Sequence, residues 1–425
     1  QYAVDDIGAI GISNQRETFV IWDKNGLPLH PAIVWQCKRS VPICENLKQR
    51  GLSSIIQERT GLIIDPYFSA TKLIWLFQNN EHIRAAIKNG QAYFGTIDSW
   101  LLYKLTKGES YLTDHTNASR TLLFNIHTLQ WDEELIEEFG LTGIQLPEIR
   151  ASSAYFGTSD FQGIFKNPIA ICSMIGDSHA AAFGEGCFDP GAAKATLGTG
   201  SSILMNIGSQ PIKSGYGMVT TINWSTEDLV CYGLEGVIVS CGATIEWLKS
   251  ELKLFNESWE TETMANAVVD NGGVYLIPAF SGLGSPHWQM DRKASITGLS
   301  FGTTKNHIVR AALESIAFQI KDVITAMEKD TAIFLKGLAT NGGLTSNTFV
   351  MQLLADLLDK PVYSSTMPDV SALGAAYMAG IKSGIYSGID FLRSIEHHTS
   401  EFVPGTNMNT QHQYEGWLKV IDSSV

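Results

Sequence analysis

Apolar positions along the chain follow two spacings, one typical of strands and the other typical of helices. Residues 7–13 and 18–22 are short apolar runs on either side of a polar centre, which predicts two strands. Residues 167–177 form a longer apolar strand that ends in a Gly-Asp turn. Residues 194–208 read as a hairpin around Gly-Thr-Gly, and residues 335–343 as a strand that ends in a glycine pair.

Apolar side chains at every third or fourth position predict helices between these strands. The longest covers residues 305–329, and one of its stripes consists of Ile308, Ala312, Leu313, Ile316 and Ile320. Shorter helices are predicted over 41–58, 70–88, 96–106, 132–140, 347–358 and 371–383. Strands and helices alternate throughout, which indicates an α/β protein.

The length of 425 residues favours two or three domains. The best candidate for a boundary is the segment 187–194, because Pro190-Gly191 marks a turn there. We therefore expect one domain over residues 1–188 and a second over residues 189–425.

Composition narrows the classes of partner and compartment. With 30 Lys and Arg against 43 Asp and Glu, the formal net charge is −13, so binding to nucleic acid is not expected. No apolar run approaches the ~18 residues that span a bilayer, and the first residues do not resemble a signal peptide. Six cysteines occur without a CxxC pair or zinc-ligand spacing. These features predict a cytoplasmic protein with reduced thiols and no contact with a membrane.

Three glycine turns follow predicted strands, at Gly198-Thr199-Gly200, at Gly242 and at Gly342-Gly343. Glycine lets backbone N–H groups approach a phosphate closely, and a following helix N-terminus favours an anion. Each turn taken alone is better explained as a plain tight turn. Together they make a nucleotide site a serious hypothesis, although no GxxxxGK[ST] loop and no strand–GxGxxG–helix fingerprint occurs.

Asp177 ends an apolar strand, at the position where ligands usually bind in α/β proteins. Its carboxylate could accept the proton of a substrate hydroxyl. The alternative is a helix N-cap, since Asp is a favoured cap residue. Both roles can coexist.

The polar centre Asn14-Gln15-Arg16-Glu17 permits two interpretations. It is either an exposed bend or a clamp for vicinal hydroxyls, in which Arg16 donates and Glu17 accepts hydrogen bonds. Trp35 and Tyr67 are similarly ambiguous between core aromatics and walls of a pocket.

Several motifs together resemble the FGGY family of carbohydrate kinases, and within it the glycerol kinases. These motifs are NQRET, AIVWQC, DPYF, TNASRTLLFNIHTLQWD, GTG, LEG…GATIEWL, PAFSGLG and ALGAAYMAG. The resemblance implies a two-domain actin/hexokinase/Hsp70-like (ribonuclease H-like) fold with a cleft between the domains. It also implies ATP- and Mg²⁺-dependent phosphorylation of a primary hydroxyl of a small polyol, such as glycerol to glycerol 3-phosphate. A homo-oligomer, dimer or tetramer, is expected on the same ground.

The resemblance also assigns roles to individual residues. Asp177 would be the base and would organise Mg²⁺ through water. The substrate would be bound by Arg16, Glu17, Trp35, Tyr67 and Asp177, and the nucleotide by Gly198, Thr199, Gly242, Gly343 and Asn347.

The sequence departs from the glycerol kinase pattern at several positions. Ser178 replaces a Gln and Ser202 replaces a Phe, which predicts a larger and more polar substrate pocket. On the nucleotide side Glu246 replaces a Gln, and Asn341 replaces an Asp. In addition, nothing in the chain matches an N-terminal family segment that carries an acidic residue and a Gly-Thr-Thr/Ser turn. A kinase for a larger polyol or ketose sugar and a non-catalytic homologue therefore remain alternatives.

Overall fold

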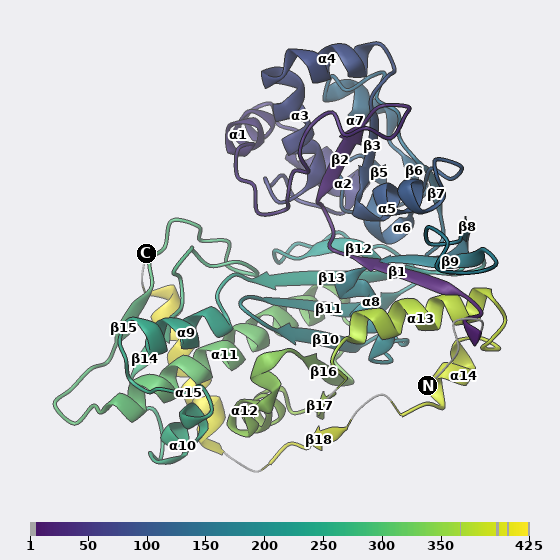
Figure 1. The fold of residues 1–425 in the computed structure, drawn as a ribbon. Helices are drawn as coiled ribbons and strands as arrows, with labels where there is room; N and C mark the ends of the chain where they lie inside the picture. The colour runs from purple at the N-terminus through teal and green to yellow at the C-terminus, as the bar shows by residue number, and fades with distance from the viewer. Residues whose placement is uncertain (1–5, 366, 397–398, 406–407, 424–425) are drawn as a thin grey trace.

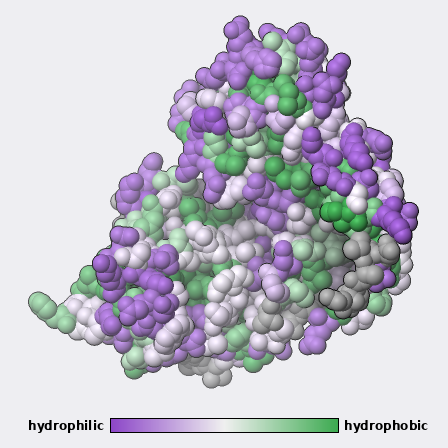
Figure 2. Space-filling view, in the orientation of Figure 1, coloured by the Kyte–Doolittle hydropathy of each residue, from purple (hydrophilic) through white to green (hydrophobic). Residues whose placement is uncertain are grey.

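The structure is a computed structural model that describes residues 6–365, 367–396, 399–405 and 408–423. The outermost residues of the two predicted domains, 1–5 and 424–425, lie outside this part. Figure 1 shows an upper lobe built from the first part of the chain above a larger region that contains the main sheet. The space-filling view shows a hollow between the upper lobe and the lower region, on the left of the picture (Figure 2).

The main sheet has seven strands in the order β12-β13-β11-β10-β16-β17-β18. β10, β16 and β17 are parallel neighbours, whereas β11, β13, β12 and β18 join antiparallel. The strands are β10 (Ala192–Leu197), β11 (Ser201–Gly208), β12 (Val219–Ser225), β13 (Val230–Ile238), β16 (Gly337–Asn341), β17 (Val362–Ser364) and β18 (Ser400–Phe402).

A second sheet has three strands, β1 (Ile10–Asn14), β9 (Ile169–Gly176) and β8 (Ser153–Ser159), in the order β1-β9-β8. Helix α13 (Val370–Lys382) packs on β1 and β9 and crosses α8 (Asp177–Gly184), although α13 comes from the C-terminal half of the chain (Figure 1). Gly11 allows the close approach, since a Cβ there would lie 2.3 Å from the carbonyl oxygen of Ala375. The two halves of the chain thus share a packed layer.

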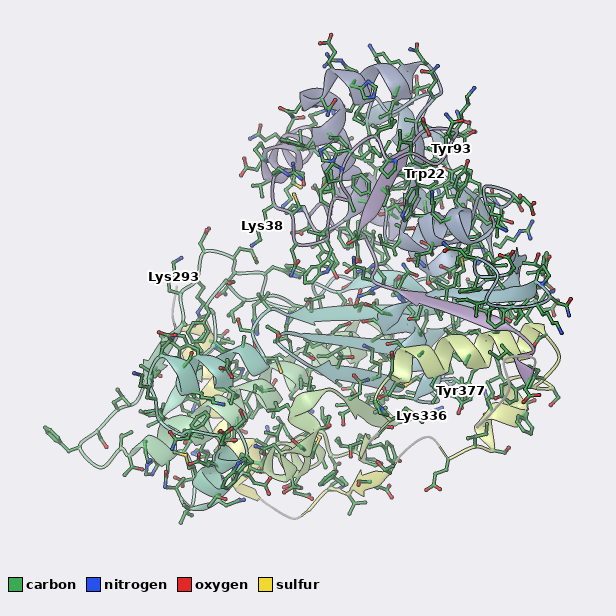
Figure 3. All side chains as sticks on the ribbon, in the orientation of Figure 1. Trp22, Lys38, Tyr93, Lys293, Lys336 and Tyr377 are labelled. Atoms are coloured by element: carbon green, nitrogen blue, oxygen red, sulfur yellow. The ribbon has the colours of Figure 1, made fainter. Side chains whose placement is uncertain are left out.

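The upper lobe is mostly helical, and its own core contains residues such as Phe19, Ile56, Leu73 and Phe94. Trp22 on β2 and Tyr93 on β3 stack with ring centroids 6.3 Å apart (Figure 3). The lobe and the elements next to it consist of β2 (Phe19–Trp22), α1 (Val41–Gln49), α2 (Ser53–Thr60), α3 (Ser69–Asn79), α4 (Glu81–Lys88), β3 (Tyr93–Thr96), α5 (Ile97–Leu105), β4 (Leu112–Asp114), α6 (His115–Ala118), β5 (Phe124–Asn125), β6 (Gln130–Trp131), α7 (Glu133–Glu138) and β7 (Glu148–Arg150).

The lower region packs helices on the main sheet around the largest core, and α11 (Lys305–Thr331) runs through its middle. Seventeen residues of α11 are buried, which explains the long apolar stripe in the sequence. The other elements here are α9 (Gly242–Ser250), α10 (Glu260–Asn266), β14 (Tyr275–Ile277), β15 (Ser295–Thr297), η2 (Gly343–Ser346), α12 (Thr348–Leu358), α14 (Ile389–Arg393) and α15 (Met408–Asp422).

The predicted α/β class and the predicted strands at the site are confirmed, with boundaries shifted by a few residues. β12 and β13 were not predicted. All seven residues of β12 are buried, including Thr220, Thr221 and Asn223, so the strand shows no alternation of apolar and polar positions.

Candidate active site

Asp177 lies where β9 ends and α8 begins. Gly176 occupies the N-cap position, so Asp177 is the first helical residue and does not itself cap the helix. Its side chain is 46% exposed, and its Oδ1 lies 3.3 Å from Arg16 Nε and accepts a hydrogen bond from the Ser178 N–H at 2.6 Å. A Cβ on Gly176 would lie 2.7 Å from Arg16 Cγ, so the glycine lets the arginine reach the carboxylate. The result is an oriented carboxylate that is open to a ligand.

A network of buried charges lies behind Asp177. Arg16 Nη2 is 2.8 Å from Glu235 Oε1, and Arg120 Nη2 is 2.6 Å from Glu235 Oε2. Arg120 Nε also donates to Glu17 Oε1 at 2.7 Å. Arg16 and Glu17 are almost fully buried, so the interpretation of residues 14–17 as an exposed bend is wrong for these two side chains. Glu235, shared by two arginines, holds the network together.

Burial and pairing act in opposite directions on the two glutamates of this network. Burial favours a raised pKa for Glu235, but Arg120 and Arg16 outweigh it and hold the pKa of that carboxyl far below its ordinary value. At Glu17, burial outweighs Arg120 and Arg16, so the pKa is raised. Glu17 also has a left-handed backbone with φ 60°, which is strained for a glutamate and typical of functional sites.

Trp35 and Tyr67 form an aromatic corner next to this network. Their ring centroids are 5.7 Å apart in an edge-on arrangement, and Trp35 is 38% exposed. The interpretation of Trp35 as a core aromatic is therefore wrong. Buried Lys72 holds the Tyr67 loop by donating to the carbonyl oxygens of Pro66 and Phe68 at 2.8 and 3.0 Å, and also to that of Tyr67.

Ser178 and Ser202 lie side by side next to Asp177. Ser178 Oγ donates to Ser202 Oγ at 3.3 Å, and Ser202 Oγ donates to Glu235 Oε1 at 3.0 Å. Lys194, fully buried on β10, donates to Ser178 Oγ at 3.3 Å. The two serines are therefore in contact in space, although they are 24 residues apart in the sequence.

The three glycine turns meet at the ends of β10 and β16. The Gly242 N–H donates to the carbonyl oxygen of Gly198 at 2.8 Å, and a Cβ on Gly342 would lie 2.5 Å from the carbonyl oxygen of Leu197. Thr199 is exposed, and a Cβ on Gly343 would meet nothing within 4 Å among the described residues. The three turns therefore lie close together, and Thr199 and Gly343 are exposed there.

The remaining nucleotide-side candidates have different surroundings. Glu246 is exposed on α9. Asn347 caps α12, since its Oδ1 accepts from the Val350 N–H and its Nδ2 donates to Thr261 Oγ1, both at 3.1 Å. Its side chain is thus already used within the protein.

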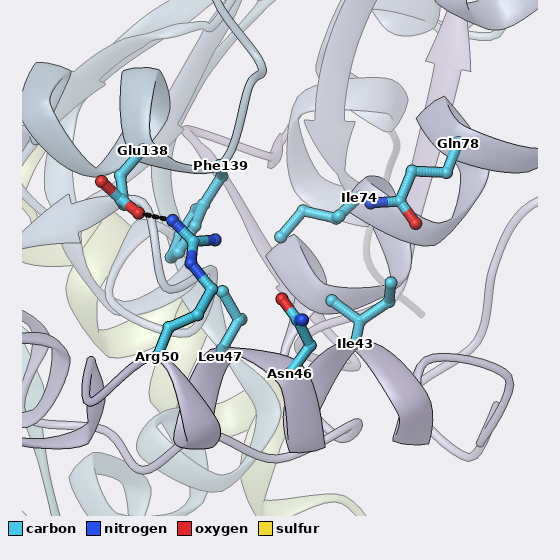
Figure 4. A pocket seen from close by; sticks show the side chains of 8 residues that line it. All are labelled: Ile43, Asn46, Leu47, Arg50, Ile74, Gln78, Glu138 and Phe139. Atoms are coloured by element: carbon cyan, nitrogen blue, oxygen red, sulfur yellow. Dashed lines mark hydrogen bonds and ion pairs between the residues drawn. The ribbon is translucent and has the colours of Figure 1, made fainter.

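Two cavities of similar size differ in their relation to this site. One of about 240 Å³ is lined by Asp177, Ser178, Thr196, Asn341 and Gly342, together with residues 367–371. The other, of about 290 Å³, lies in the upper lobe between α1 and α3, with the Arg50–Glu138 ion pair at its edge (Figure 4). Only the first touches the predicted catalytic carboxylate, so it is the candidate active-site cavity.

Sequence reasoning missed three charged residues of the site: Arg120, Lys194 and Glu235. Each lies in a motif that was noticed for other residues: Arg120 in TNASRTLLF, Lys194 before the GTG turn, and Glu235 in LEG. A buried charge has no signature of its own in a single sequence. Only the ion pairs of Arg120 with Glu17 and Glu235 in the folded chain identify Arg120 and Glu235 as parts of the site.

The described residues also bear on metal binding and membrane insertion. They contain no group of three or more His, Cys, Asp or Glu side chains that could hold a metal ion. Within the same ranges, none of the helices is long and apolar enough to cross a membrane.

Comparison with known proteins places these features in a family. Models of the N- and C-terminal domains of the FGGY family of carbohydrate kinases match residues 1–184 and 193–383. A glycerol kinase of Pseudomonas fluorescens is 47% identical over 419 residues, which cover 98% of this chain and 82% of the relative. Glycerol kinase 2 of Thermotoga maritima is 45% identical over 423 residues, with 99% and 85% covered.

Solved structures agree with these matches. A Plasmodium falciparum glycerol kinase with ADP superimposes with a TM-score of 0.93 at 37% identity, covering 99% of this chain and 84% of that chain. A xylulose kinase from Lactobacillus acidophilus shares the fold, with a TM-score of 0.87 at 21% identity and coverage of 98% and 85%. The chain thus has the predicted two-domain kinase fold, and it belongs to the FGGY family of carbohydrate kinases.

Proposed function

We propose that this protein transfers the terminal phosphoryl group of ATP to a primary hydroxyl of a small polyol, and converts glycerol to glycerol 3-phosphate. The observation that carries the proposal is the half-exposed Asp177 carboxylate, held by Arg16 at 3.3 Å beside a cavity of about 240 Å³. The names of the similar proteins support glycerol as the acceptor.

The charges of the pocket favour an uncharged substrate. Arg16 pairs with Asp177 and Glu235, and Arg120 pairs with Glu17 and Glu235, so these charges already have partners of opposite sign. An acid or an amine would disturb this balance, whereas a polyol would not. The hydroxyls of a polyol would hydrogen-bond to Arg16 and Glu17, and its carbon chain would pack on Trp35 and Tyr67.

In this mechanism Asp177 accepts the proton of the attacking hydroxyl. Arg16 keeps the carboxylate oriented, and Glu235 and Glu17 fix the two arginines through buried ion pairs. Phosphoryl transfer depends mainly on positioning and on stabilising charge, and the buried ion pairs position Arg16 against Asp177.

ATP would bind at the converging glycine turns, with Gly198 and Thr199 near the phosphates and Gly242, Glu246, Gly343 and Asn347 around the nucleotide. Mg²⁺ commonly takes one or two protein carboxylates plus substrate phosphates and water. Asp177, as an exposed carboxylate next to the cavity, suits such a water-mediated contact. When bound, the ion would neutralise charge on the phosphates.

The test is a direct assay of purified protein with ATP, Mg²⁺ and glycerol, which follows ADP release and identifies glycerol 3-phosphate by mass. Formation of that product supports the proposal. Binding of ATP and polyol with no product at any enzyme concentration would instead indicate a non-catalytic homologue.

A second candidate is a kinase for a larger polyol or a ketose sugar. The specific observation in its favour is the contact between Ser178 and Ser202, at positions where the resemblance places the bulkier Gln and Phe. The same assay with four- and five-carbon polyols and with ketoses would distinguish the two candidates through kcat/KM.

We also infer that residues 1–188 and 189–425 form the two domains, and that the protein acts in the cytoplasm as a dimer or tetramer. Six free cysteines, five of them buried, support a reducing compartment. The family resemblance supports the oligomer, and light scattering on the purified protein would measure its mass.

A further inference from the structure

Four polar side chains form a continuous line of hydrogen bonds, which we call the serine line: Lys194, Ser178, Ser202 and Glu235. Each group donates to the next, over 3.3 Å, 3.3 Å and 3.0 Å. The ends are a fully buried ammonium and a fully buried carboxylate, whereas the two serines in the middle are partly exposed. Ser178 lines the cavity of about 240 Å³ and Ser202 is its hydrogen-bond partner, so two hydroxyls lie at the pocket between two buried charged groups of opposite sign.

The register of the main sheet explains this geometry. Thr196 pairs with Ser202 across β10 and β11, and Leu204 pairs with Lys194 on one side and Glu235 on the other. Residues paired in this way share one face of the sheet. Helix α8 packs against β10 and β11, and Ser178 in its first turn completes the line.

We propose that the serine line is a specificity-determining subsite that binds a substrate hydroxyl beyond the third carbon of a polyol. This inference rests on the proposed function and extends its substrate class from glycerol to polyols of four or more carbons. Lys194 also donates to Thr196 Oγ1 at 2.8 Å, which is shorter than its 3.3 Å bond to Ser178. The bond between the serines is also long, since 3.3 Å is well above the ~2.7–2.8 Å usual for O–H···O bonds.

A hydroxyl inserted at that point would accept from Ser178 and donate to Ser202, so that every polar group keeps a partner. The ammonium of Lys194 and the carboxylate of Glu235 polarise the two serines in the same direction, which strengthens both new bonds. A methyl group at the same place would separate the serines without replacing their bond. The subsite should therefore distinguish a hydroxyl from a methyl at equal chain length.

Two four-carbon probes test this distinction, erythritol and 1,2,3-butanetriol, which lacks one terminal hydroxyl. With the full chain, kcat/KM for erythritol should exceed that for butanetriol by roughly 10-fold or more, as expected when a site must otherwise leave polar groups unpaired. In Ser178→Ala and Ser202→Ala this ratio should fall towards one, while kcat/KM for glycerol changes less. Lys194→Met should lower the same ratio, because it removes the ammonium that polarises Ser178.

Ser201→Ala is the matched control. It removes the same atom one residue away, from a side chain that is buried and has no hydrogen-bond partner among the described residues. Its erythritol-to-butanetriol ratio should equal that of the wild type. Ser178→Thr and Ser202→Thr keep the hydroxyl and should retain most of the preference, which separates loss of the hydroxyl from misfolding.

A wild-type ratio near one, or a ratio that the alanine variants leave unchanged, would overturn the inference. If glycerol is phosphorylated but erythritol is not preferred over butanetriol, the subsite is overturned and the proposed function is still supported. If no polyol is phosphorylated, the proposed function fails. Calorimetric binding of the two probes in the presence of ADP then still tests the subsite, and equal affinities would overturn it.

Discussion

Glu235 is the residue on which the buried charges of the site depend. Its two oxygens face Arg16 at 2.8 Å and Arg120 at 2.6 Å, and the side chain is fully buried. Removing one partner of a buried pair leaves an uncompensated charge, which typically costs about 3–5 kcal/mol. Arg16 is in turn the group that orients Asp177. A substitution of Glu235 would therefore disturb the orientation of the Asp177 carboxylate without removing a contact to the substrate.

The role of Asp177 can be tested with Asp177→Asn. The amide keeps the shape of the carboxylate but cannot accept the proton, so kcat should fall by roughly 10²–10⁴. The measurement is steady-state turnover with ATP and glycerol. Asp189→Asn is a suitable control, because Asp189 is an exposed partner of Arg393 and should leave kcat unchanged. Turnover of Asp177→Asn within a factor of two of the wild type would contradict its assignment as the base.

The buried carboxyl of Glu185 should make the free energy of unfolding depend on pH. Burial raises the pKa of this carboxyl from its ordinary value of 4.5 to about 7, only partly offset by the hydrogen bond that Asn341 Nδ2 donates at 2.8 Å. Between pH 4.5 and 7 the folded state retains a proton that the unfolded chain has lost. The contribution of Glu185 to the free energy of unfolding therefore falls as pH rises through that window, by at most about 3 kcal/mol.

Glu185→Gln removes this titration and can still accept the bond from Asn341. The stability of the variant relative to the wild type should increase from pH 4.5 to 8, measured by urea unfolding. The raised pKa of Asp98, also about 7, is common to both proteins and cancels in the comparison. Glu137→Gln makes the same substitution on an exposed residue of α7 and is the matched control. A flat difference for Glu185→Gln would show that this carboxyl titrates normally.

At the scale of elements, the crossing of α8 and α13 ties the two halves of the chain together. The backbones approach so closely that a Cβ on Gly374 would lie 1.8 Å from the carbonyl oxygen of Ala180, and one on Gly184 would lie 2.5 Å from that of Val370. Both obstacles are backbone atoms, which cannot turn aside as a flexible side chain could. Because α8 carries Asp177 and Ser178, this crossing also positions the site.

Gly374→Ala should force the two helices apart. Overpacking of this kind typically lowers the free energy of unfolding by about 1–3 kcal/mol, and backbone contact favours the upper end of this range. Urea unfolding measures the change. Gly343→Ala adds the same methyl group where nothing among the described residues lies within 4 Å, so its stability should be close to that of the wild type. Equal stabilities of the two variants would show that the helices are not in close contact.

The arrangement of the whole molecule suggests motion between the two halves. The chain passes from the first half to the second between α8 and β10. Helix α13 of the second half then packs on the sheet of β1, β9 and β8 in the first half (Figure 1). A kinase benefits from closing around its substrates, because exclusion of water limits hydrolysis of ATP. The hollow between the upper lobe and the lower region leaves room for such closure (Figure 2).

We expect the two halves, divided near residue 190, to rotate towards each other when polyol and a non-hydrolysable ATP analogue bind together. Small-angle X-ray scattering should show a smaller radius of gyration with both ligands than with either one alone. An unchanged radius with both ligands at saturating concentrations would count against closure.

The sequence by itself determined the features that depend on local spacing. The strand that ends at Asp177, the hairpin around Gly198 and the long helix over residues 305–329 follow from apolar periodicity and glycine turns. The motifs were sufficient for the family, and they include Asp177 and Ser178, which line the candidate active-site cavity. Local signals suffice here because a turn or an amphipathic helix is specified by residues that are close together in the sequence.

Only the tertiary structure decided the network behind those residues. Glu17 and Arg120 are 103 positions apart in the chain, and Ser178 and Ser202 are 24 positions apart. No local sequence pattern therefore predicts their contacts. The same holds for Arg16 and Glu17, which a single sequence could equally place on an exposed bend. Burial decides between such alternatives, because a charged side chain out of water must find a partner, and that partner is chosen by the packing of the whole chain.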